Sequence, residues 1–77
     1  MIEHHINRDI MEYMVWVVEI VAAEFFGRDK SAAYTALKEN GLWDIYIDHY
    51  DTTHTLSQEY LLEEIRDYLL ERGVGIL

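Results

Sequence analysis

The segment 8–26 is apolar around most of the circumference that it would have as a helix. Its apolar side chains recur at spacings of three and four residues, which is the period of an α-helix. They form two neighbouring rows, one of Ile10, Met14, Val17, Val21 and Phe25, the other of Met11, Val15, Val18, Ala22 and Phe26. A helix of this kind lies at the centre of its domain or packs against a second chain. In a chain of 77 residues, this helix constrains how the remaining helices can pack.

Glycines divide the rest of the chain into further helical pieces. Gly27, Gly41 and Gly73 each follow a run with helical spacing, where a left-handed residue commonly closes a helix. The β-branched stretch 14–21 would also suit a strand, but a single strand would find no partner in this sequence. We therefore predict one all-α domain over residues 1–77, a compact bundle of four helices with short loops and a mobile N-terminus at 1–6. The expected helices are 8–26, 30–39, 42–50 and 58–72.

Short polar residues mark where the predicted helices begin. Asn7 and Asp29 can cap the first two helices by accepting hydrogen bonds from free backbone amides, and either Thr55 or Ser57 can cap the last one. The polar stretch 51–55 is predicted to be a turn, because its side chains compete for local backbone hydrogen bonds. The expected buried faces of the three later helices are Ala33, Tyr34 and Leu37; Leu42, Ile45, Tyr46 and His49; and Leu61, Leu62, Ile65, Tyr68 and Leu69.

The net charge of −9 argues against nucleic acid as a ligand. The chain has fifteen acidic residues and only six basic ones, which are scattered along the sequence. Binding a polyanion requires clustered lysine and arginine. The acidic residues fall on the outer faces of the third and last helices, so the charge is a surface property with a basic protein as a possible target. Cysteine is absent, and the longest charge-free run of the first helix, 13–18, is too short to cross a membrane. We expect a cytoplasmic protein without a membrane partner.

Histidines are the only residues that suggest catalysis or metal binding. His4 and His5 are adjacent on an extended segment, where their side chains diverge, and His49 and His54 lack the spacing of a helical zinc pair. His54 is expected to hold a backbone carbonyl through one ring nitrogen, although a ligand or partner contact is an alternative. No glycine-rich phosphate loop is present. We therefore predict no catalytic residue, metal or cofactor, with a small enzyme or metal protein using His49 and His54 as the alternative.

Aromatic residues are more frequent than a core of this size requires. Tryptophan and tyrosine are enriched where interfaces bury most of their binding energy. Trp16 interrupts the polar strip between Glu12 and Glu19, so it is our first candidate for an exposed interface anchor, and Trp43 is the second.

The second half of the chain resembles a small bacterial family known only as a domain of unknown function. The matching residues lie between Phe26 and Gly73, and the most specific stretch runs from Tyr50 through His54, Thr55 and Leu56 to Ser57. The resemblance supplies no activity that could be assigned to this chain. It does imply a gene neighbourhood that includes an ADP-ribosyltransferase-like toxin, and hence an antitoxin or accessory role.

Together these observations predict a small acidic interaction module. The nearly all-round apolar helix 8–26 favours self-association, so we expect a homo-oligomer that also binds a basic protein. The alternative is an antitoxin whose acidic helices cover a cationic cleft of a neighbouring toxin. The candidate interface or motif residues are Trp16, Trp43, Tyr50, His54, Thr55 and Ser57.

Overall fold

The computed structural model describes residues 8–76, and every regular element in that range is a helix. The predicted all-α class is therefore confirmed for these residues. The expected mobile segment 1–6 and the Asn7 cap lie outside the described residues. The helices are α1 (Arg8–Phe25), α2 (Lys30–Glu39), α3 (Leu42–Asp48), α4 (Tyr50–Thr53) and α5 (Gln58–Glu71).

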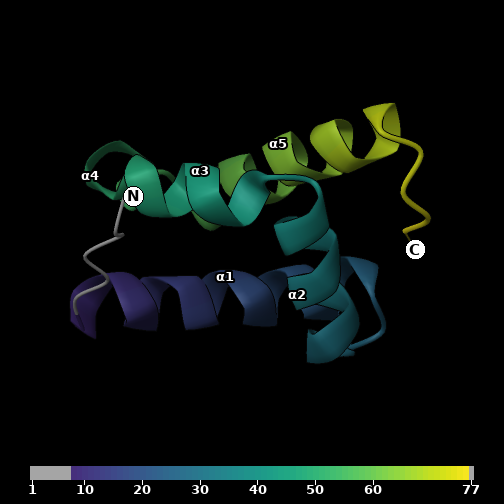
Figure 1. Ribbon diagram of the computed structural model, residues 1–77, viewed down its shortest axis with the longest axis horizontal. Coiled ribbons are helices and arrows are strands. Elements are labelled where there is room, and N and C mark those ends of the chain that lie inside the picture. Colours follow the sequence, from purple (N-terminus) through teal and green to yellow (C-terminus); the bar gives the residue numbers. More distant parts are fainter. Residues whose placement is uncertain (1–7, 77) are drawn as a thin grey trace.

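The helices form two layers joined at one end (Figure 1). Helix α1 lies along one side, α3, α4 and α5 lie along the other, and α2 crosses between them. Helix α1 contacts α2, α3 and α5, so it forms one layer of the domain and supplies much of its core. It does not lie at the centre that its apolar circumference predicts, because Met11 and Val15 stay exposed. The largest fully buried side chains are Met14, Val17, Val21, Leu37, Tyr46, Leu61, Ile65 and Leu69.

Two side-chain caps begin helices as the sequence predicts. The Asp29 carboxylate accepts a hydrogen bond from the Ala32 amide at 3.0 Å. The Ser57 hydroxyl accepts one from the Tyr60 amide at 3.2 Å, so Ser57 caps α5. Thr55, the alternative cap, instead donates its hydroxyl to a backbone carbonyl at the end of α4.

Left-handed glycines close the helices where the sequence predicts them. Gly41 has a φ of 80° and is the one residue between the cap of α2 and the first residue of α3. Gly27 and Gly73 also adopt positive φ. Because other residues pay a steric cost in this conformation, Gly27 and Gly41 suit the short connections between helices, and Gly73 suits the end of α5.

The predicted third helix is wrong in its boundaries. Helix α3 ends at Asp48, and the region expected to be a turn contains the separate one-turn helix α4. His49 leaves helical geometry with ψ at 28°, and the Thr53 amide then donates to the His49 carbonyl at 2.8 Å. The Tyr13 hydroxyl of α1 donates to the Thr53 carbonyl at 3.2 Å. This contact from a distant helix satisfies the carbonyl at the end of α4 and adds to the local hydrogen bonds of that turn.

Two of the predicted buried faces need correction. In α2, Tyr34 is 41% exposed and Ala36 is buried in its place, because alanine lets α2 lie close against its neighbours. In α3, Ile45 and His49 are exposed and Ile47 is buried. The face of α5 is as predicted, with every member buried or half-buried.

The second apolar row of α1 is covered only in part. Met11 is 42% exposed and Val15 48%, whereas Val18 and Phe26 pack partly against the core and Ala22 is buried. None of the helices within residues 8–76 combines the length and apolarity needed to cross a bilayer.

Candidate functional site

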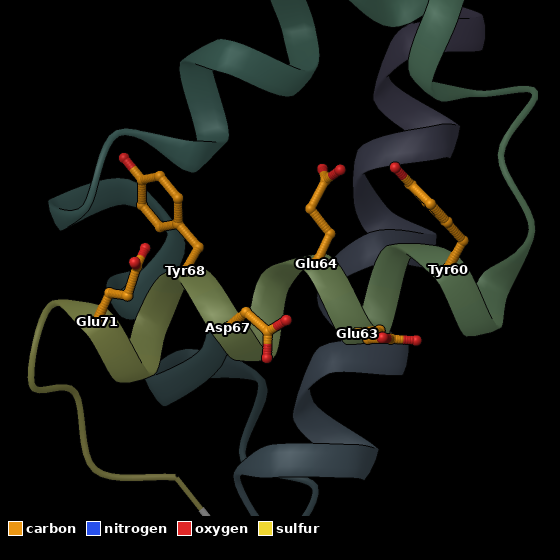
Figure 2. A pocket seen from close by; sticks show the side chains of 6 residues that line it. All are labelled: Tyr60, Glu63, Glu64, Asp67, Tyr68 and Glu71. Carbon is orange, nitrogen blue, oxygen red and sulfur yellow. The ribbon is translucent and has the colours of Figure 1, made fainter.

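One face of α5 combines four carboxylates with two tyrosines around a shallow groove of about 380 Å³. Tyr60, Glu64 and Tyr68 follow each other at intervals of four residues, so they point to the same side of the helix (Figure 2). Buried leucines and Ile65 hold another side of α5 on the core, so the four carboxylates of this face are exposed, whereas Tyr68 is half-buried at its edge. We call this surface the acidic face; its residues are Tyr60, Glu63, Glu64, Asp67, Tyr68 and Glu71.

Little positive charge offsets the acidic face. Arg66 pairs with Asp67 at 3.3 Å, and the Arg72 guanidinium carbon lies 4.4 Å from the centre of the Tyr68 ring. Within residues 8–76, no ion pair involves Glu63, Glu64 or Glu71. The acidic face therefore retains a concentrated negative charge toward solvent.

A second depression, of about 450 Å³, lies where α3 and α4 meet the start of α5. We call it the α3–α5 cleft; its main lining residues are Ile45, Tyr46, His49, Leu56, Tyr60 and Glu64, with Thr52 and Thr53 completing it. Tyr60 and Glu64 line both depressions, so the cleft and the acidic face form one continuous surface. The cleft supplies apolar walls and the acidic face supplies charge.

Tyr46 links the core to the carboxylate at the cleft. Its side chain is 1% exposed, and its hydroxyl donates to Glu64 Oε1 at 3.0 Å. Burial raises the pKa of Tyr46 far above its ordinary value, and the adjacent Glu64 carboxylate raises that pKa further. The phenol therefore remains a hydrogen-bond donor at neutral pH and fixes the Glu64 carboxylate at the wall of the cleft.

Thr53 carries an unsatisfied hydroxyl behind the cleft. The residue is 8% exposed, and its buried Oγ1 has no hydrogen-bond partner. Thr53→Val keeps the shape and removes that polar atom, so we expect the free energy of unfolding to rise by about 1 kcal/mol. Urea denaturation measures this change. The exposed neighbour provides the control, because Thr52→Val should alter stability by less than about 0.5 kcal/mol. A Thr53→Val variant less stable than the wild type would contradict the prediction.

Three of the predicted candidate residues share one aromatic row. Tyr13 joins them: its ring centre lies 5.9 Å from that of Trp16 and 5.4 Å from that of Tyr50. The His54 ring stacks on Tyr50 at 4.5 Å with 14° between the planes. His54 Nδ1 lies 2.5 Å from the Tyr50 carbonyl oxygen, and because a carbonyl can only accept, Nδ1 carries the proton. The expectation that His54 holds a backbone carbonyl is confirmed.

Neither tryptophan is the exposed anchor that the sequence predicts. Trp16 is half-buried against the core, and its ring centre lies 5.9 Å from that of Tyr13. Trp43 is also half-buried, and it packs edge-on against Tyr34 at 4.9 Å in a separate pair. Prominent exposed aromatic area belongs instead to Tyr60, which is 55% exposed and was not singled out from the sequence.

The histidines of the described chain do not converge. His49 lines the α3–α5 cleft, whereas the His54 ring is engaged in the aromatic row. No group of three or more histidine, cysteine, aspartate or glutamate side chains is arranged to hold a metal within residues 8–76. His4 and His5 lie outside the described residues.

Comparisons with known proteins give a family without an assigned activity. A family model described as a protein of unknown function, DUF3791, matches residues 12–72. This match includes most of α1 as well as the second half of the chain, on which the resemblance in the sequence rests. No curated protein and no solved structure matches the chain. The chain therefore belongs to the DUF3791 family.

Proposed function

We propose that this domain is a protein-interaction module that binds a basic segment of a partner protein through the acidic face and the adjoining α3–α5 cleft. The observation that carries the proposal is the continuity of the two depressions, which share Tyr60 and Glu64. A purely acidic surface would attract any cation. An adjoining apolar cleft with an exposed tyrosine adds the kind of contact that supplies binding energy at protein interfaces.

The charge distribution supports a basic partner. The acidic face bears four carboxylates, of which Asp67 alone has an ion-pair partner within residues 8–76. Complementary charge speeds the encounter of two proteins and selects among partners, with an effect that salt weakens.

A charge-neutralised variant tests the proposal. The probe is a decapeptide of arginine and lysine alternating with glycine, and binding is measured by fluorescence anisotropy at low and physiological salt. Neutralising the acidic face should weaken binding by about tenfold or more, because complementary charges then no longer meet. The substitutions are Glu63→Gln, Glu64→Gln, Asp67→Asn and Glu71→Gln.

A matched control separates the acidic face from net charge. It removes the same amount of charge from exposed positions elsewhere, by Asp9→Asn, Glu12→Gln, Glu19→Gln and Glu39→Gln. This control should weaken binding by only about twofold, as long-range screening between exposed charges predicts. Equal losses in the two variants, or no binding to the wild type, would overturn the proposal.

Self-association through α1 is a second candidate. Met11 and Val15 are exposed on this helix, and Arg8, Glu12 and Glu19 border them. Sedimentation velocity at micromolar concentration distinguishes the candidates. A dimer that Val15→Glu converts to a monomer would support an α1 interface, and a monomer at all concentrations would remove it.

The gene neighbourhood implied by the family resemblance suggests the first partner to test. If an ADP-ribosyltransferase-like toxin is encoded beside this protein, the acidic face is the surface we expect to contact it. Co-expression of the toxin with the wild type and with the neutralised variant connects this antitoxin role to the acidic face. If the wild type and the neutralised variant rescue growth equally, the antitoxin role does not depend on the acidic face.

A further inference from the structure

We propose that the α3–α5 cleft receives the side chain of a single arginine from the partner protein. This inference rests on the proposed function and makes it specific, since it names one residue type and one place on the surface. It draws on three features of the cleft: a fixed carboxylate, an exposed tyrosine ring and apolar walls.

The carboxylate is Glu64, and the protein holds it in place. The Tyr46 hydroxyl donates to Glu64 Oε1, whereas Oε2 has no hydrogen-bond or ion-pair partner within residues 8–76. Anchoring one oxygen reduces the freedom that a glutamate side chain loses when it binds a cation. The carboxylate keeps lone pairs for the N–H groups of a guanidinium.

The ring is Tyr60, four residues before Glu64 and pointing to the same side of α5 (Figure 2). It is 55% exposed, and no cation lies over it in the described part of the chain. The same helix already shows the arrangement that we infer. Arg72, four residues after Tyr68, places its guanidinium 4.4 Å from the Tyr68 ring centre. At the equivalent position after Tyr60 the chain has Glu64, so the cation must come from outside.

The walls suit the aliphatic part of an arginine. Ile45 is 41% exposed beside the cleft, and Leu56 is half-buried within it. Long basic side chains bury their methylene groups on such surfaces while the charged end remains near polar partners.

Arginine fits these features better than lysine does. Its planar guanidinium can stack on a tyrosine ring and present two parallel N–H donors to a carboxylate at the same time. An ammonium group is more strongly hydrated and lacks the flat surface, so it would gain less from Tyr60.

NMR titration of the ¹⁵N-labelled protein tests the inference. The probe is an acetylated and amidated pentapeptide of glycine with one central arginine, compared with the same peptides carrying lysine or neutral citrulline. We expect the arginine peptide to shift the backbone amides of residues 45–56 and 60–64. We expect the lysine peptide to bind about threefold more weakly or worse, and citrulline to bind more weakly still.

Matched variants locate the contact. Glu64→Gln should weaken arginine binding by about tenfold, although its amide oxygen can still accept the Tyr46 hydroxyl and preserve the fold. Tyr60→Leu should weaken binding by about threefold and remove most of the preference for arginine over lysine. Glu59→Gln removes one charge from the same helix outside both depressions, and it should change binding by less than about twofold.

The outcomes distinguish this inference from the proposed function. Equal binding of the arginine and lysine peptides, or equal losses in Glu64→Gln and Glu59→Gln, would overturn the arginine site. If the basic decapeptide still binds through the acidic face, the proposed function survives that result. If neither peptide binds the wild type, both fail.

Discussion

Tyr46→Ala is expected to lower the free energy of unfolding by about 3–5 kcal/mol, because it empties the space of a fully buried aromatic side chain. Tyr46 is 1% exposed and is the largest of the fully buried side chains. A domain of this length is stable by roughly 4–12 kcal/mol, so the variant loses a large part of its stability. Urea denaturation followed by far-ultraviolet circular dichroism measures the change.

Two companion variants separate the causes of that loss. Tyr46→Phe keeps the ring and removes the hydrogen bond to Glu64, which should cost only about 1–2 kcal/mol. Ile45→Ala alters the exposed neighbour and should cost less than about 1 kcal/mol. A loss below about 1.5 kcal/mol for Tyr46→Ala would show that the surrounding side chains close the space, contrary to the packing described.

Stability is expected to fall steeply above about pH 10, where tyrosines of the unfolded chain ionise. Burial raises the pKa of Tyr46 in the folded state, and the charge of Glu64 adds to this effect. The pKa of Tyr13 is also raised, chiefly by burial. Above about pH 10, the folded chain therefore keeps protons that the unfolded chain has released. The free energy of unfolding should then decrease by up to about 1.4 kcal/mol per pH unit for each such tyrosine.

Below about pH 10 neither tyrosine makes the free energy of unfolding depend on pH, because both are protonated in the folded and in the unfolded chain. Urea denaturation between about pH 8 and 11.5 measures the profile. Tyr46→Phe should remove the larger part of the alkaline decline, whereas Tyr34→Phe, at a position that is 41% exposed, should leave it in place. An unchanged profile in Tyr46→Phe would contradict the expected role of this phenol.

Local signals predicted most of the helical architecture. The bounds of α2 match the prediction, and Asp29 and Ser57 cap their helices because capping depends on a few adjacent atoms. The packing of α1 against three other helices followed from its apolar circumference. These features are encoded within one helix or one turn, so the sequence alone carries them.

The errors occur where contacts between distant residues decide the outcome. Helix α4 forms in a segment with turn-like composition, and Tyr13 donates to the Thr53 carbonyl at its end from α1. The error at Tyr34 is of another kind, because Ala33, Ala36 and Leu37 already share one helical face at spacings of three and four, and Tyr34 lies outside it. The contact of Tyr13 leaves no periodic pattern in the sequence.

The candidate site was only half visible for the same reason. The acidic residues of α5 were expected on an outer face, and the structure places them there, four of them around the groove of the acidic face. The α3–α5 cleft was not predicted, because it forms only when residues from 45–56 pack beside Tyr60 and Glu64 of another helix. The one available signal was the spacing of four between Tyr60 and Glu64, which also occurs in ordinary solvent-facing helices.

The contacts of α1 have a consequence for how the domain is made. Helix α1 packs against α2 and α3, which follow it closely, and against α5, the last helix within residues 8–76. A ribosome releases α5 after α1 to α4, so the nascent chain holds α1 without that cover until α5 has emerged. Transiently exposed apolar surface makes such intermediates prone to aggregation. Translation that stops before Gln58 would therefore leave an incomplete core and yield an aggregation-prone fragment.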